Sequence, residues 1–219
     1  MKYLYISIYV LLFTVLILAD YPVLQADEQV AITLFQETGV PNAVSGILLR
    51  NRLFDTVCEV MVFAVAVMTA NILLSQHAPP RKMHYIQDDI TLILFRLGTT
   101  IAALICLELA LRGHLSPGGG FAAGVAGATA MGLVAISSDP TKIQATFDKK
   151  HLKTWEKVSV FLFIGCSVLT LLNIQLSGLF TEAEVSSIMI PILNILITIK
   201  VAIGACAIML AFIRYRGLF

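Results

Sequence analysis

Charge is scarce in this sequence, and its scarcity excludes several classes of protein. Asp, Glu, Lys and Arg make up 13% of the 219 residues, whereas soluble domains have roughly 25%. The net charge is +1, so there is no excess of basic residues to neutralise nucleic-acid phosphates. Hydrophobic residues make up 58% and the mean hydropathy is +0.88. This composition predicts an all-α protein that crosses a membrane several times.

Cysteine is also sparse, and its spacing predicts neither a metal site nor a redox motif. No two of the four cysteines have CxxC spacing, and none lies in a His-Cys cluster. We expect them to be small apolar packing residues inside the spans; they are Cys58, Cys106, Cys166 and Cys206. The sequence has no nucleotide-binding loop or cofactor motif, so we expect no cofactor and no stand-alone enzyme.

Six apolar runs are close to the length of about 20 residues that a membrane-spanning helix requires. They lie near residues 3–19, 53–75, 90–111, 120–137, 157–176 and 188–213. A polar loop at residues 76–89 separates the first two runs from the other four, which predicts a two-span segment at residues 1–78 and a four-span domain at residues 79–219. The first run could instead be a signal peptide, because Lys2 precedes it. The absence of a small-x-small cleavage site after it favours a retained span.

The distribution of basic residues predicts the orientation. With the N-terminus inside, the three outer basic residues are Arg50, Arg52 and Arg112. The inner segments then hold ten: Lys2, Arg81, Lys82, Lys142, Lys149, Lys150, Lys153, Lys157, Arg214 and Arg216. By the positive-inside rule, both termini are cytoplasmic in a multi-pass protein of the cell's inner (plasma) membrane.

Two connecting segments carry their own signals. Residues 27–38 of the first outer loop predict a short amphipathic helix, which the turn Gly39-Val40-Pro41-Asn42 ends. The inner loop at residues 138–156 is the most polar part of the chain. Its lysines either determine topology only or also contact a soluble partner or anionic lipid.

Four ionisable side chains fall inside the predicted spans: Glu59, Arg96, Glu108 and Lys200. Each costs at least about 2.5 kcal/mol to place in hydrocarbon, so each requires a physical reason. One interpretation is that they pair to join helices, or that Arg96 and Glu108 snorkel to the interface. The other is a relay that passes protons or steers cations. Lys200 is the strongest candidate for the relay, since it lies near the midplane, where snorkelling is difficult and desolvation disfavours its charge.

A glycine-rich segment joins the third and fourth predicted spans. It reads Arg112-Gly-His114-Leu-Ser-Pro117-Gly118-Gly119-Gly120-Phe121-Ala-Ala-Gly124. Small residues then recur every four positions at Gly120, Gly124, Ala128 and Gly132, which places them on one helix face. Either this face packs against a helix of the same protein, or it seats a helix of another subunit. His114 could titrate near neutral pH, although a lone surface histidine is more often incidental.

This segment resembles the signature of the B subunit of Mrp-type multisubunit sodium/proton antiporters, Arg-Gly-His-x-x-Pro-Gly-Gly-Gly-Phe-x-x-Gly. That subunit has four spans, as expected here for residues 90–219. The preceding region resembles the C-terminal part of the antiporter A subunit, or the equivalent small subunit of membrane-bound hydrogenases. The turn Gly39-x-Pro41-Asn42 and the motif Asp55-Thr56-x-x-Glu59 carry this second resemblance.

The sequence departs from the A-subunit pattern at three positions. Arg50 stands where the family has an acid, and Leu53 and Cys58 stand where it has glycines. The loss of the acid removes support for a cation site at the outer surface. Glu59 is retained, and the resemblance implies that it lies on an ion or proton route. The resemblance also implies partners, namely large antiporter subunits related to the pumping subunits of respiratory complex I.

The sequence therefore predicts a membrane subunit of a Na⁺/H⁺ antiporter complex. Glu59 and Lys200 would handle protons or cations, with Glu108, Arg96 and Asp55 as further candidates. Asp55 and Thr56 would cap the second helix, and residues 117–124 would hold neighbouring helices together. The chain could alternatively be the ion-translocating part of a hydrogenase-like redox complex, or a scaffold whose charges tolerate neutral substitution.

Overall fold

The computed structural model describes residues 28–76, 88–138, 145–146, 149, 151–171 and 182–216, and these are helical or connect helices, without any β-strand. The elements are α2 (Glu28–Thr38), α3 (Ala43–Gly46), the π-helical turn η1 (Ile47–Asn51), α4 (Leu53–Ser75), α5 (Asp89–Arg112), α6 (Gly120–Ser137), α8 (Leu152–Leu171) and α9 (Glu182–Arg216). The chain divides into two compact units, residues 1–32 and 33–219. The arrangement described below is that of the second unit.

Five helices in the described ranges are long and apolar enough to cross a membrane. They are α4, α5, α6, residues Thr154–Leu171 of α8 and residues Glu184–Tyr215 of α9. This confirms a multi-pass, all-α membrane protein. The first predicted run, residues 3–19, lies outside the described residues. The short helix predicted at residues 27–38 is α2, and Gly39 ends it with a φ of 67°, a conformation that glycine adopts without strain.

The start of α8 differs from the prediction. The sequence placed Glu156 in a polar loop and began the span at residue 157, but α8 begins at Leu152. Its buried side chains recur at helical spacing from Glu156 onward, through Ser159, Phe163 and Ser167. The lysines in and just before this helix hid the pattern in the sequence. The correction moves Glu156 from a loop into a membrane-spanning helix.

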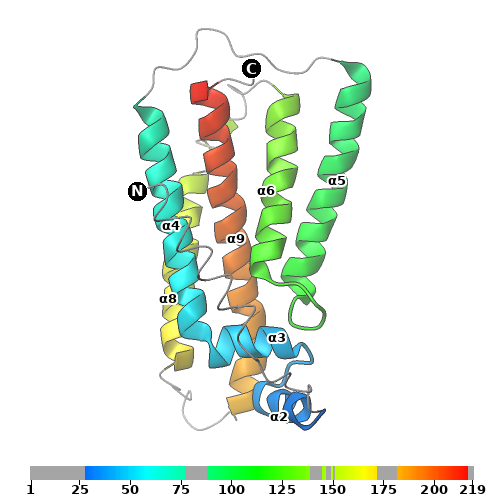
Figure 1. Ribbon diagram of the computed structural model, residues 1–219, viewed down its shortest axis with the longest axis vertical. Helices are drawn as coiled ribbons and strands as arrows, with labels where there is room; N and C mark the ends of the chain where they lie inside the picture. Colours follow the sequence, from blue (N-terminus) through cyan, green and yellow to red (C-terminus); the bar gives the residue numbers. More distant parts are fainter. Residues whose placement is uncertain are drawn as a thin grey trace, which may run out of the picture. The chain divides into compact units, whose positions relative to one another are not determined.

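Helix α9 lies in the middle of the bundle, with α4 and α8 on one side of it and α6 between it and α5 (Figure 1). Helices α4, α6 and α9 begin at the end of the bundle where α3 lies, and α5 and α8 end there (Figure 1). One apolar cluster joins α9 to α4 and α8: Val40, Leu49, Leu53, Val60, Phe163, Ile190, Leu193, Ile197 and Val201. A second joins α9 to α6: Ala135, Ile203, Cys206, Ala207, Leu210 and Ile213.

The small-residue face of α6 packs against α9 of the same chain. A Cβ atom added at Gly124 would lie 2.4 Å from Val201 Cβ, and one at Gly132 would lie 2.8 Å from Met209 Sδ. Gly120 approaches α9 in the same way, at Asn194 and Ile197. The interpretation that this face seats a helix of another subunit is therefore wrong, because α9 already occupies it.

The glycines before α6 turn the chain out of α5. Gly118 and Gly119 have φ values of 157° and 148°, which residues with a Cβ rarely adopt. A Cβ at Gly118 would also lie 2.6 Å from Leu109 Cδ2. Backbone conformation at Gly118 and Gly119, and close helix contact from Gly120 onward, thus account for the run of three glycines.

Asn42 joins the two motifs that the sequence singled out. Its Oδ1 accepts a hydrogen bond from the Val44 backbone N–H at 3.1 Å, which caps α3. Its Nδ2 donates to the carbonyl oxygens of Gly113 and Ser116, each at 2.7 Å. The turn at residues 39–42 therefore holds the α5–α6 loop in place through buried polar contacts.

Replacing Asn42 with alanine is expected to lower the free energy of unfolding by about 2–4 kcal/mol, because it removes a helix cap and the hydrogen bonds that join α3 to the Gly113 and Ser116 carbonyl groups. Thermal unfolding of the purified protein in detergent measures this loss. Asn51 is exposed, so Asn51→Ala is the matched control and should change stability by less than about 0.5 kcal/mol. Equal effects of the two substitutions would contradict the role assigned to Asn42.

Candidate functional site

The buried charges of the bundle meet where α8 crosses α9. The Lys200 ammonium on α9 donates a hydrogen bond to Glu156 Oε1 on α8, and the two side chains are only 3% and 14% exposed. Lys200 Nζ also lies 5.6 Å from the ring centroid of Phe63 on α4, within range for a cation–π interaction. Three helices thus enclose this ion pair.

Glycine makes the close approach at the pair possible. A Cβ at Gly204, one helical turn after Lys200, would lie 2.8 Å from Phe63 Cε1 and 3.4 Å from Glu156 Oε1. Any larger residue at this position would displace the ring or the carboxylate. Gly204 therefore sets how closely α4 and α8 approach the middle of α9.

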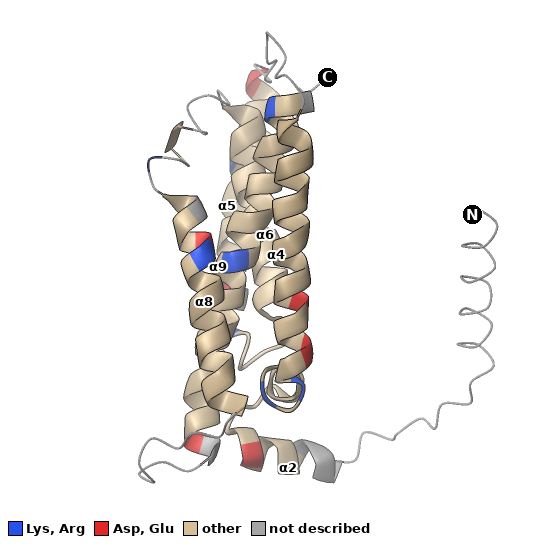
Figure 2. Ribbon diagram, turned by 90° about the vertical axis from the view of Figure 1, so that its left-hand side faces the viewer, with Lys and Arg blue, Asp and Glu red and all other residues tan. Residues whose placement is uncertain are grey.

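Lys200 lies at the middle of its span. The apolar part of α9 runs from Glu184 to Tyr215. At 1.5 Å of rise per residue, Lys200 is about 24 Å from Glu184 and about 22 Å from Tyr215. Helix α8 begins part of the way along α9 rather than at its end (Figures 1 and 2). Helix α8 begins between the middle of α9 and its C-terminal end (Figure 1), so that Glu156, near the start of α8, meets Lys200.

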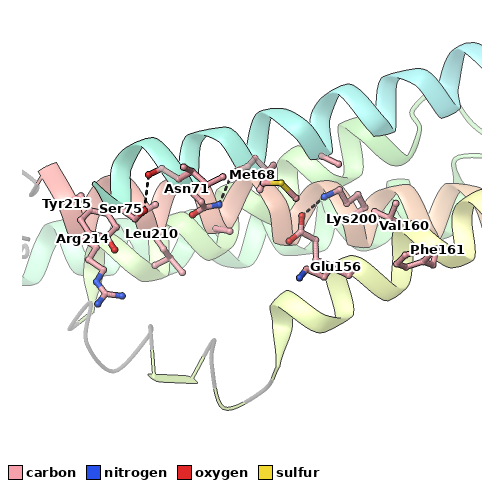
Figure 3. Close-up of a pocket in the computed structure, with 16 residues that line it drawn as sticks. Met68, Asn71, Ser75, Glu156, Val160, Phe161, Lys200, Leu210, Arg214 and Tyr215 are labelled. Carbon is pink, nitrogen blue, oxygen red and sulfur yellow. Dashed lines mark hydrogen bonds and ion pairs between the residues drawn. The ribbon is translucent and has the colours of Figure 1, made fainter. Parts of the chain in front are cut away.

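A groove of about 490 Å³ runs between α4, α8 and α9 from the pair toward the C-terminal ends of α4 and α9. Figure 3 shows Glu156 and Lys200 at one end of the groove and Ser75, Arg214 and Tyr215 at the other. The remaining lining is polar at Asn71 and Lys157 and otherwise apolar: Ala64, Val67, Met68, Ile72, Val160, Phe161, Ala207, Leu210 and Ala211. The groove connects the buried pair to one end of the bundle.

A buried acid and amine in contact can exist in two forms. In the ionic form each charge stabilises the other, and removing either partner leaves a costly buried charge. In the neutral form one proton has moved from the amine to the carboxylate, so the protonation states of the two groups are coupled. The pair can therefore change between an ionic and a neutral form without a net charge, and it can pass a proton on only if it takes up one proton as it releases another.

The other predicted charges are not joined to this pair. Within the described ranges, no hydrogen bond or ion pair links Glu59, Arg96 or Glu108 to Lys200. Glu59 and Arg96 are exposed on α4 and α5. Glu108 pairs with Arg112 at 2.9 Å on the outer surface of α5. Among the ionisable residues that the sequence singled out, Lys200 is thus the one that the described structure buries, and its partner is Glu156.

The predicted capping roles of Asp55 and Thr56 are wrong. Helix α4 begins without a side-chain cap. The Asp55 carboxylate instead accepts a hydrogen bond from Arg52 Nε at 2.8 Å, and the Thr56 hydroxyl donates to the Leu48 carbonyl at 2.8 Å. The π-helical turn before α4 supplies the Leu48 carbonyl, and Arg52 directly follows this turn; nothing in the sequence signals a π-helical turn.

The described residues contain neither a disulfide nor a cluster of metal-binding side chains. All four cysteines are unpaired, and no group of three or more His, Cys, Asp or Glu residues gathers in the part of the chain that the structure describes. Large apolar side chains cover the outer faces of α4 and α5, among them Val62, Val65, Ile93 and Leu104. Figure 2 shows that few charged residues interrupt the bundle between its two ends.

Comparisons with known proteins agree with this architecture. An uncharacterised protein of Methanocaldococcus jannaschii is 27% identical over 75% of this chain and 74% of its own length. A chain in the structure of the membrane-bound sulfane sulfur reductase, an archaeal respiratory membrane complex, has the same fold. It aligns with a TM-score of 0.70 and 23% identity, over 98% of this chain and 99% of its own. Residues 90–207, which include α5, α6, α8 and Lys200, match the family of domains related to the MnhB subunit of Na⁺/H⁺ antiporters, and the chain therefore belongs to this family.

Proposed function

We propose that the chain is a membrane subunit of a multisubunit cation/proton antiporter, Na⁺/H⁺ being the exchange that its family suggests. The observation that carries the proposal is the Glu156–Lys200 pair, buried at mid-depth in the bundle and reached by a groove from one end. Buried ionisable groups in membrane helices are rare and usually mark ion or proton pathways. The chain would act with other membrane subunits and not alone, in the plasma membrane.

The direction of the groove follows from the positive-inside rule. Arg214 and Arg216 end α9 at the same end of the bundle as the groove mouth. If basic residues mark the cytoplasmic side, the groove opens to the cytoplasm and α3 lies at the outer surface. In this orientation both termini are cytoplasmic, residues 1–78 supply two spans and residues 79–219 supply four.

The proposal also assigns a role in ion or proton handling to Glu59, on the outer surface of the bundle. It lies six residues into α4, about 9 Å from the helix start, on an exposed face. An unpaired carboxylate at this depth costs energy against lipid, so a neighbouring subunit is expected to cover it. Glu59 would then handle ions or protons at the boundary between subunits, and Asp55, Arg96 and Glu108 would have secondary roles.

Replacing Glu59 with glutamine is expected to abolish sodium-dependent proton exchange while the complex still assembles, because glutamine keeps the shape and hydrogen-bonding capacity but cannot carry the charge. Exchange is measured in everted vesicles that contain the complex. Glu108→Gln is the control and should retain most of the activity, since Glu108 forms an exposed pair with Arg112. Unchanged exchange in Glu59→Gln would show that Glu59 is structural.

A redox-driven complex is the second candidate function. The fold shared with a chain of the sulfane sulfur reductase favours it, since that protein is a respiratory membrane complex. In such an assembly this chain would move ions, and other subunits would carry the redox chemistry. Identification of the subunits that purify with the chain separates the two: iron–sulfur subunits favour the redox complex, and their absence favours the antiporter.

A further inference from the structure

We infer that the groove between α4, α8 and α9 is a water-filled inlet that carries protons, and not sodium ions, to the Glu156–Lys200 pair. The inference rests on the proposed function, since it specifies which ion the buried site handles. It depends on three observations: the polar groups along the groove, the positive charge of its lining, and the Lys200 ammonium, which already contacts the Glu156 carboxylate.

Polar side chains recur along the groove from its mouth to its base. Ser75 and Arg214 lie at the mouth, Asn71 lies one helical turn deeper than Ser75 on α4, and Glu156 and Lys200 lie at the base (Figure 3). The Asn71 Nδ2 and Ser75 Oγ atoms donate to the backbone of their own helix, which leaves the acceptor oxygen of each side chain for water. Water can therefore bridge successive polar groups along this wall.

The groove has a positive charge. Its lining contains three cations, Lys157, Lys200 and Arg214, and one acid, Glu156, so its formal charge is 3 − 1 = +2. A positive lining in a narrow, partly apolar groove repels metal cations. A proton need not travel as a free cation, since it can pass along hydrogen-bonded water to a group that accepts it.

Lys200 occupies the position that a sodium ion would need. Its ammonium contacts Glu156 Oε1 and lies 5.6 Å from the centroid of the Phe63 ring, which offers no oxygen ligand. Hard cations are bound by several oxygen atoms, whereas the described partner of Glu156 Oε1 is the Lys200 ammonium. The surroundings therefore suit exchange of a proton and not coordination of sodium.

The proton step at the base of the groove is balanced. Lys200 Nζ–H gives its proton to Glu156 Oε1, so an N–H bond breaks, an O–H bond forms, and the pair becomes neutral. The Lys200 amine then takes up a proton from water in the groove as Glu156 releases its own proton to water, so the ionic form is restored and no net charge is left. Tyr215, Lys157 and Arg214 are the other titratable groups that face the groove, and they lie on its walls and at its mouth.

Charged thiol reagents test whether the groove holds water and which charge it favours. The four native cysteines are first replaced by alanine. In this background Met68, which lines the groove, is replaced by cysteine. The control is Thr69→Cys, at almost the same depth on the outward face of α4. In everted vesicles of the assembled complex, Met68→Cys should react about tenfold faster with an anionic methanethiosulfonate than with a cationic one. Molar salt should reduce this preference, and Thr69→Cys should react with neither reagent. The inference is overturned if Met68→Cys reacts with neither reagent, as expected for a groove filled by lipid. It is also overturned if Met68→Cys reacts faster with the cationic reagent.

Transport kinetics separate this inference from the proposed function. Glu156→Asp keeps the charge but shortens the side chain, so proton exchange should slow several-fold while the sodium concentration that gives half-maximal exchange stays within about twofold of wild type. If exchange slows and the sodium concentration that gives half-maximal exchange also rises about tenfold, the proton assignment is overturned and the proposed function still stands. An unchanged rate would contradict the proposed function, even if the groove admits the reagents.

Discussion

Replacing Lys200 with methionine is expected to lower the free energy of unfolding by about 3–5 kcal/mol, because it leaves the Glu156 carboxylate buried without its partner. Methionine fills a similar volume, so the loss arises from charge and not from a cavity. Lys200 is 3% exposed and its ammonium contacts Glu156 directly, so solvent replaces little of the lost interaction. The thermal unfolding midpoint of the purified complex in detergent measures the change.

The double variant Lys200→Met and Glu156→Gln tests this explanation. With both charges removed, no unpaired charge remains, and stability should return to within about 1 kcal/mol of wild type or exceed it. If the double variant is as unstable as Lys200→Met alone, the loss comes from packing around Phe63 and Gly204, and the pair is not the cause.

Replacing Gly124 with alanine is the second large change that the structure predicts. The new Cβ would lie 2.4 Å from Val201 Cβ and 3.1 Å from the Thr198 carbonyl oxygen. Both atoms lie at or close to the backbone of α9, so they cannot move aside independently of the helix. We expect α6 and α9 to be forced apart at a cost of about 1–3 kcal/mol, with less assembled complex in the membrane.

Gly165 on α8 provides the matched control. A Cβ added there meets nothing within 4 Å, and alanine is the better helix former. Gly165→Ala should leave the amount of assembled complex unchanged or raise it slightly. Comparison of the two variants by native electrophoresis of solubilised membranes measures the effect. Equal losses would mean that glycine on these helices matters for a reason other than the α6–α9 contact.

The five spans that the structure describes could be predicted from the sequence because hydrocarbon imposes a strict length and composition on each helix. The fourth predicted run coincides with α6, residues 120–137. The start of α8 was misplaced because Lys149, Lys150 and Lys153 resemble a loop. Charge in a membrane helix is acceptable when a partner neutralises it, and the partner of Glu156 lies 44 residues away on α9.

The site was predictable only in part. Lys200 could be singled out because a lysine at mid-depth is costly wherever it faces. Its partner could not, because pairing depends on how α8 is offset along α9, which no local pattern encodes. The glycine motif was recognisable, but the choice between packing inside the chain and contact with another subunit required the neighbours of Gly124. Asn42 was recognised only as part of a turn and Asn194 was missed, although both donate to backbone carbonyls near the end of α5.

Proton movement by the purified complex in proteoliposomes is the most direct test of the central claim that the Glu156–Lys200 pair handles ions. The double variant Lys200→Met and Glu156→Gln is the form to measure, because it removes both charges without leaving one unpaired. We predict that this variant assembles with its partner subunits and moves protons at less than about a tenth of the wild-type rate, the loss typical of removing a proton-transferring group. An assembled double variant that moves protons at the wild-type rate would contradict the claim and leave the pair with a purely structural role.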